Sequence, residues 1–145
     1  MRKPASRMWM SLALLTAAAT NGAPTGGRSR MLLYVDNSLG DDITVVDLGT
    51  LKAIGAIKVG ERPHGLCAPA DGRKLFTTIE SENNLKTIDT ITGKVVDSIP
   101  VTGRPNECAV TPDGRYVGVP IRDGNSVDVV DVARVALAVE QRLEV

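Results

Sequence analysis

The sequence predicts an all-β fold built from a repeating unit of four short antiparallel strands. Three observations lead to this prediction. The chain repeats itself at a fixed step, each repeat has the periodicity of strands, and turn residues separate the strands at regular places.

The repeat is clearest in two stretches, RPHGLCAPADGRKLF and RPNECAVTPDGRYVG. Pro63 recurs as Pro105, a step of 42 residues, and no gap is needed to keep the frame. The aspartates that end TVVD, KTID and DVVD keep the same step (Asp47, Asp89 and Asp131). This many matches in one frame indicate a true structural repeat.

Each repeat has strand periodicity. The segments KLFTTIE, NLKTIDT and KVVDSIPV are short, rich in β-branched residues and bounded by turn sequences. TPDGR places Pro and Gly where a type I turn prefers them. We therefore expect four strands in a unit, starting near His64, Lys74, Leu85 and Lys94.

Four strands in a unit of about 40–45 residues is typical of a β-propeller blade. The apolar runs of the second and third strands fit burial on both faces of the sheet. Stacked blades need such two-sided burial. A plain β-sandwich is the alternative architecture.

The N-terminus differs from the repeats. MRKPASR is basic, and the apolar stretch Met8–Ala19 is shorter than the roughly 20 residues that span a bilayer as a helix. Residues 1–19 therefore predict a signal peptide cut after about Ala19, and residues 20–30 a flexible leader. We expect an exported, periplasmic or extracellular protein without a membrane span after signal removal. The alternative is a true start at Met31.

The charge balance excludes one class of partner. The chain has 17 basic and 17 acidic side chains and no run of either sign, so no electrostatic footprint for nucleic acid is present. Aromatic residues make up only 3%, which argues against stacking platforms for bases.

Several segments resemble the YVTN repeat of bacterial secreted propellers, the group that includes YncE-like and surface-layer proteins. They are MLLYVDN, ITVVDLGTLKAIGAIKVGERPHGLCAPADGRKLFTT, TITGKVVDSIPVTGRP and TPDGRYVGV. The resemblance covers about residues 31–145 and implies an exported β-propeller. Related folds include lactonases and the propeller domains of nitrous oxide reductase and quinoprotein amine dehydrogenases, so the resemblance indicates fold more than function.

The repeat divides residues 31–145 into strands b–d of a first blade (31–61), a second blade (62–103) and a third blade (104–145). Propellers contain about four to eight blades, so a partial propeller is expected, and further blades or other chains are needed to close the ring. Three explanations stay open: a fragment of a longer reading frame, a ring of several chains, or a free-standing partial propeller.

The start of the first strand in each blade supplies the candidate ligand-binding residues. In propellers this strand lines the central channel, so five residues are expected near the channel rim (Arg62, His64, Arg104, Asn106 and Glu107). The two arginines suit a carboxylate or phosphate group. His64 suits a general base or a metal ligand, or else it fills a variable position that Asn106 fills in the next repeat.

The two cysteines are expected to be small apolar packing residues. Cys67 aligns with Ala109, whereas Cys108 aligns with Leu66. This offset of one residue points their side chains to opposite faces of their blades, which argues against a disulfide or a shared metal. No metal site and no cofactor are expected, because a single histidine cannot supply a converging ligand set.

The repeated aspartates are interpreted as turn residues whose carboxylates accept backbone N–H bonds. They comprise the three strand-ending aspartates and the two in the Asp-Gly turns (Asp47, Asp89, Asp131, Asp71 and Asp113). The arginines that follow the Asp-Gly pairs, Arg73 and Arg115, are expected to be solvated.

Together these observations favour an exported propeller scaffold that binds a small ligand or a protein partner, with no assignable catalytic residues. The alternative is a propeller enzyme or enzyme domain, either lactonase-like or of the quinoprotein or copper redox type. More ionisable residues at the first-strand starts of further blades would favour the enzyme.

Overall fold

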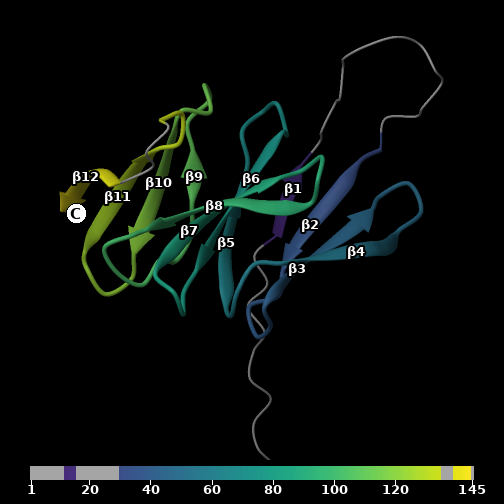
Figure 1. The fold of residues 1–145 in the computed structure, drawn as a ribbon, viewed down its shortest axis with the longest axis horizontal. Helices are drawn as coiled ribbons and strands as arrows, with labels where there is room; N and C mark the ends of the chain where they lie inside the picture. Colours follow the sequence, from purple (N-terminus) through teal and green to yellow (C-terminus); the bar gives the residue numbers. More distant parts are fainter. Residues whose placement is uncertain (1–11, 16–29, 135–138, 145) are drawn as a thin grey trace, which may run out of the picture.

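The computed structural model describes residues 12–15, 30–134 and 139–144, which form three four-stranded antiparallel sheets. The sheets follow one another along the chain and lie side by side (Figure 1). Their strand orders are β1-β2-β3-β4, β5-β6-β7-β8 and β12-β11-β10-β9. This arrangement confirms the predicted all-β fold of propeller blades.

The strand bounds follow the predicted repeat. The first sheet comprises β1 (Leu12–Leu15), β2 (Leu32–Asp36), β3 (Asp42–Asp47) and β4 (Lys52–Lys58). The second comprises β5 (Pro63–Cys67), β6 (Lys74–Ile79), β7 (Asn84–Asp89) and β8 (Lys94–Pro100). The third comprises β9 (Ala109–Val110), β10 (Tyr116–Ile121), β11 (Ser126–Asp131) and β12 (Val139–Glu144).

The first sheet has one strand more than its repeat unit supplies. β1 pairs antiparallel with β2, with Leu12 opposite Val35, and occupies the position that β5 holds beside β6. β1 lies within the segment predicted to be a signal peptide, so cleavage after about Ala19 would remove this strand. The rest of that segment and most of the predicted leader lie outside the described residues.

The core lies between the sheets and forms two clusters. Leu75, Ile79 and Ile88 of the second sheet pack toward the first sheet. Their counterparts 42 residues later, Val117, Ile121 and Val130, pack in the same way from the third sheet toward the second. Equivalent residues therefore face the preceding sheet, and the sheets stack front to back. Phe76 of β6 faces the third sheet, which gives this strand the predicted two-sided burial.

The turns use the residues that the sequence indicates. Gly114 donates its N–H to the Thr111 carbonyl at 2.8 Å, closing the TPDG turn. The Asp89 carboxylate accepts the backbone N–H groups of Ile91 and Thr92 at 2.9 and 2.7 Å. The carboxylates of the other four repeated aspartates also accept backbone N–H bonds (Asp47, Asp71, Asp113 and Asp131). The predicted turn role is therefore confirmed for all five.

Arg115 is exposed, as predicted for a turn residue, but it also contacts two neighbouring side chains. Its Nε and a terminal nitrogen donate to the Asp131 carboxylate at 3.2 and 3.1 Å, and its guanidinium lies 4.9 Å from the ring centroid of Tyr116. Burial raises the pKa of Asp131, but the backbone N–H of Ala133 and the Arg115 guanidinium outweigh it, and the pKa is lowered overall.

The expectation for the cysteines was wrong. Cys67 and Cys108 form a disulfide, with their Cα atoms 5.8 Å apart. Their side chains do point to opposite faces of their own sheets. Because the sheets stack front to back, however, opposite faces of neighbouring sheets are the ones that meet. An offset of one residue is therefore what a bond between sheets requires.

Candidate functional site

The candidate site is centred on one buried carboxylate, that of Glu80, whose side chain is 4% exposed. Three arginines contact it. Arg62 lies 3.1 Å away, Arg122 lies 3.4 Å away, and Arg104 donates from two nitrogens, including Nε at 3.2 Å. We call these four residues, together with His64 and Asn106, the arginine cluster.

The repeat brings these residues to one end of the sheets. Arg62 lies in the linker between β4 and β5, Arg104 lies in the linker between β8 and β9, and Glu80 and Arg122 directly follow β6 and β10. The Glu80 N–H donates to the Arg62 carbonyl at 3.1 Å. The Arg122 N–H donates to the Arg104 carbonyl at 2.8 Å, so each linker is fixed to its own sheet in the same way.

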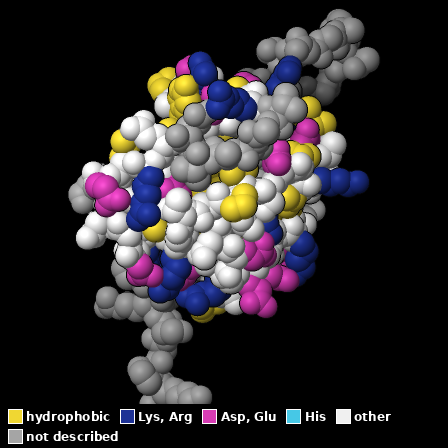
Figure 2. Space-filling model, turned by 60° about the vertical axis from the view of Figure 1, so that its left-hand side comes forward, with side chains coloured by type: hydrophobic (Ala, Val, Ile, Leu, Met, Phe, Trp, Pro, Cys, Tyr) yellow, Lys and Arg dark blue, Asp and Glu magenta, His cyan; other side chains and the backbone are white. Residues whose placement is uncertain are grey.

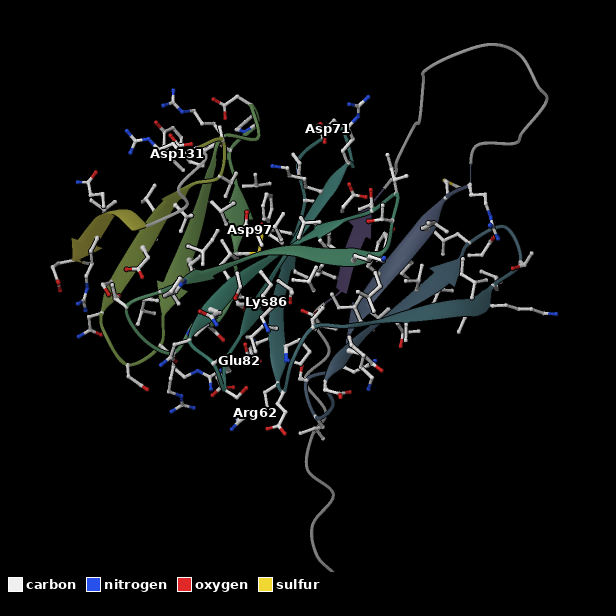
Figure 3. The ribbon with its side chains drawn as sticks, viewed as in Figure 1. Arg62, Asp71, Glu82, Lys86, Asp97 and Asp131 are labelled. Atoms are coloured by element: carbon white, nitrogen blue, oxygen red, sulfur yellow. A yellow bond between two sulfur atoms is a disulfide. The ribbon has the colours of Figure 1, made fainter. Side chains whose placement is uncertain are left out.

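The end that carries Arg62 is visible in Figure 3. Arg62 lies at the lower end of the molecule in that view, whereas Asp71 and Asp131 lie at the opposite end. The backbone of Arg62 has a φ of 59°, in the left-handed region that residues other than glycine rarely adopt. Such local strain persists only where surrounding contacts hold it, and it is common at functional positions.

One terminal nitrogen of Arg122 contacts residues of both the second and the third sheet. This terminal nitrogen lies 3.1 Å from His64 Nε2 and 3.0 Å from the Asn106 side-chain oxygen. A guanidinium has only donors, so in this contact His64 Nε2 is the acceptor, and Nδ1 is the second ring nitrogen. That Nδ1 atom is buried without a hydrogen bond in the described structure and lies 4.0 Å from the Glu107 carboxylate.

The electrostatics of the cluster keep Glu80 ionised. Burial raises the pKa of Glu80, but the hydrogen bond from Arg104 and the charges of Arg62, Arg122 and Arg104 outweigh it, and the pKa is lowered. Asp36, at the end of β2, behaves in the opposite way. Burial raises its pKa to about 8, against a hydrogen bond from Thr77 and with a further contribution from the charge of Glu107.

The cluster has cationic groups available to solvent. The side chains of Arg62 and Arg122 are 57% and 37% exposed although both contact Glu80. Among the described residues, the carboxylates that contact the three guanidiniums are those of Glu80 and Asp123. The Glu107 carboxylate lies beside the cluster, 4.0 Å from His64 Nδ1. The partly exposed guanidiniums of Arg62 and Arg122 suit a carboxylate or phosphate group.

All five sequence-predicted candidates lie in or beside this cluster (Arg62, His64, Arg104, Asn106 and Glu107). Sequence reasoning missed Glu80 and Arg122. A signal was available in the sequence. The two residues are 42 apart and carry opposite charges at the same repeat position. They directly follow β6 and β10, the strands that pair with the segments carrying His64 and Asn106.

The rest of the described surface offers less. A hollow at the opposite end of the sheets is lined by two prolines and by side chains of both charges (Pro69, Pro112, Arg73, Lys74, Asp71 and Asp113). On the side of the third sheet, basic and acidic side chains alternate without a patch of one sign (Figure 2). No group of three or more His, Cys, Asp or Glu side chains that could hold a metal occurs in the described residues. None of these residues forms a helix long and apolar enough to cross a membrane.

Comparison with known proteins supports the fold. Hydrazine synthase of Kuenenia stuttgartiensis aligns with a TM-score of 0.74 and 20% identity over 86% of this chain and 40% of that chain. The Cps50 (Swd1) β-propeller domain of Myceliophteria thermophila aligns with a TM-score of 0.70 and 13% identity over 95% of this chain and 39% of that domain. A Bacteroides fragilis protein assigned provisionally as a 6-phosphogluconolactonase has a TM-score of 0.70, with 18% identity over 79% of this chain and 36% of that protein.

These identities are low, so the similarity concerns the fold alone. No family model and no curated protein matches the sequence. The chain spans 36–40% of the length of the three structures named. With its three front-to-back sheets, the chain has the fold of consecutive blades of a β-propeller.

Proposed function

We propose that the chain is part of an exported propeller of the YVTN type that acts as a binding scaffold. The arginine cluster is its binding site, and the ligand group that it holds is a carboxylate or a phosphate. The observation that carries the proposal is the convergence of three guanidiniums, from the second and third sheets, on the single buried carboxylate of Glu80.

Glu80 acts as an organiser of the site. Its carboxylate holds Arg104 through two donors and orients Arg62 and Arg122 beside it. The side chains of Arg62 and Arg122 stay partly exposed, so both guanidiniums are accessible to a ligand group. A carboxylate or phosphate group that approaches from solvent meets donors already fixed in place, which lowers the entropic cost of binding.

Two features support export. The basic and apolar N-terminal sequence has the form of a signal peptide. The Cys67–Cys108 disulfide fits an oxidising compartment, where such bonds persist. Removal of the signal peptide would expose the edge of β2 that β1 covers.

The proposal is tested by phosphate binding to the full 145-residue chain at constant ionic strength. His64 is the only histidine of the chain, so its ring protons report on the cluster without overlap in an NMR titration. We expect Arg62→Gln to weaken the affinity for inorganic phosphate at least about threefold. Acetate, measured in a separate series, tests the carboxylate in the same way.

Arg73→Gln is the matched control. It removes the same charge from an exposed arginine at the opposite end of the second sheet. Equal phosphate affinities of the two variants would show that only the net charge matters, and would overturn the assignment of the cluster. So would a wild-type chain that binds neither anion below about 10 mM.

A further inference from the structure

We propose that the Cys67–Cys108 disulfide positions the arginine cluster, so that its reduction by a dithiol weakens anion binding. The proposal rests on the binding function proposed for the cluster. It concerns the regulation of that site and assigns a role to two residues that do not contact the ligand group.

The disulfide lies in the same two segments that carry the cluster. Cys67 ends β5, three residues after His64. Cys108 precedes β9 and follows Asn106 by two residues. The bond therefore joins the His64 segment of the second sheet to the Asn106 segment of the third sheet.

Between the disulfide and the cluster the two segments are in close contact. A Cβ atom built on Gly65 would lie 2.6 Å from the Glu107 Cα and 2.8 Å from the Asn106 carbonyl oxygen, so the backbones touch. The Thr78 hydroxyl accepts the Gly65 N–H and donates to the Asn106 carbonyl, each at 2.8 Å. The hydroxyl group is thus a second bridge between the same segments.

The cluster requires this spacing. One terminal nitrogen of Arg122 serves both His64 Nε2, at 3.1 Å, and Asn106 Oδ1, at 3.0 Å. These two acceptors belong to different sheets. If the segments separate, one nitrogen cannot reach both acceptors, and Arg122 loses the orientation that directs its other donors.

No other covalent bond links the two segments directly. Along the chain they are separated by β6, β7 and β8, with 41 residues from one cysteine to the other. Without the disulfide, the spacing depends on the packing between the two sheets and on the Thr78 bridge.

The reaction is ordinary thiol–disulfide exchange. A thiolate of the dithiol attacks one sulfur, the Cys67–Cys108 bond breaks, and a mixed disulfide forms. The second thiol of the reagent then displaces the protein sulfur and closes a cyclic disulfide. The protein gains two electrons and two protons, and the dithiol loses them.

The test compares the oxidised and the dithiothreitol-reduced full chain by the NMR signals of His64 and by phosphate titration. In the oxidised chain we expect a single set of His64 signals, because the disulfide holds the two segments at one spacing. In the reduced chain we expect shifted or broadened His64 signals and phosphate affinity at least about threefold lower.

The Cys67→Ala/Cys108→Ala variant should resemble the reduced chain and be insensitive to dithiothreitol. If the reduced chain unfolds, sucrose added to every sample restores the folded state for the comparison. His64 signals that do not change upon reduction of the folded chain overturn this inference, whatever the phosphate result. Changed signals with an unchanged phosphate affinity overturn the coupling to binding. A chain that binds no phosphate in either state overturns the proposed function, and the His64 signals then test the positioning alone.

Discussion

Glu80 accepts hydrogen bonds from Arg104 across the boundary between the second and third sheets, from the Nε atom at 3.2 Å and from a terminal nitrogen. This pair links the end of β6 to the linker that precedes β9. Since Glu80 is buried and also contacts Arg62 and Arg122, its loss affects three guanidiniums at once.

We therefore predict that Glu80→Gln destabilises the fold by roughly 2 kcal/mol, because three arginines lose a buried counter-ion. Urea denaturation measures the change. Glu61→Gln is the control, because Glu61 is exposed and its backbone carbonyl, not its carboxylate, accepts the hydrogen bond from the Ser81 hydroxyl; it should stay within about 0.5 kcal/mol of the wild type. Because the pKa of Glu80 is lowered in the fold, its contribution is present above pH 4.5, its ordinary pKa, and is lost as the pH falls through the folded pKa. A Glu80→Gln variant as stable as the wild type at neutral pH would contradict the prediction.

We predict that the contribution of Asp36 to the free energy of unfolding depends on pH with the opposite sign. Burial raises the pKa of Asp36 from 3.8 to about 8, so folding takes up a proton between these two values. The contribution of Asp36 to stability is therefore most favourable near pH 4 and becomes less favourable as the pH rises toward 8. Asp36→Asn keeps the shape of the side chain without a charge. At pH 8 we expect it to be more stable than the wild type by at least about 1 kcal/mol, with the difference shrinking toward pH 4.

Denaturation midpoints from pH 4 to pH 9 check this expectation. Asp97→Asn is the matched control, because it removes the same charge from an exposed residue of β8. If Asp36→Asn gives a flat difference from the wild type, Asp36 is ionised in the folded chain and the expectation fails.

The close approach of the second and third sheets at Gly65 predicts the effect of adding a side chain there. Gly65→Ala would place a Cβ atom 2.6 Å from the Glu107 backbone, so the two segments must move apart. We expect destabilisation by roughly 2 kcal/mol and a shift of the His64 NMR signals. Gly55→Ala is the control, because nothing lies within 4 Å of a Cβ at Gly55. Similar stabilities of the two variants would show that the close contact is absent in solution.

The positive φ of Leu51 predicts that a glycine at this position stabilises the fold. Its φ is 55°, and it occupies the repeat position that Gly93, with φ of 65°, fills in the next sheet. The Leu51 side chain is also exposed, so little burial is lost when it is removed. Leu51→Gly should therefore stabilise the chain by about 1 kcal/mol, as measured by urea denaturation. The reciprocal change, Gly93→Leu, should destabilise it by a similar amount, and a loss of stability in Leu51→Gly would refute the strain argument.

The sequence predicts most of the fold because the repeat is regular. Strand starts expected near His64, Lys74 and Leu85 lie within one residue of the starts of β5, β6 and β7. The pairing of β1 with β2 could not be predicted in this way, because Leu12–Leu15 lies outside the repeat frame and reads as part of an apolar leader.

The candidate site was predicted in part for the same reason. The linker residues Arg62 and Arg104 are marked by the prolines that follow them, so the repeat shows their place. Glu80 lies in the polar run ESENN, which looks like an ordinary turn, and its burial depends on arginines contributed by the neighbouring sheet. Burial between sheets is a tertiary property that periodicity within one strand does not contain.

The disulfide was misjudged because one sheet was considered at a time. Strand alternation gave the correct face for Cys67 and for Cys108, but the meeting of unlike faces is a property of the stack. An alignment of repeats is sufficient to identify such pairs once the stacking direction is known.

The front-to-back stacking also gives the row of sheets a direction, because the forward face of one sheet always packs against the backward face of the next. Each described interface pairs a forward-facing residue such as Phe76 with backward-facing ones such as Val117, 41 residues later. A duplicated second blade inserted between residues 103 and 104 would therefore meet both neighbours with matching faces. The same blade placed in reverse orientation would match neither. The row of sheets can thus be lengthened by whole 42-residue modules. New disulfides between neighbouring sheets should use the same offset of one residue in the repeat alignment that Cys67 and Cys108 have.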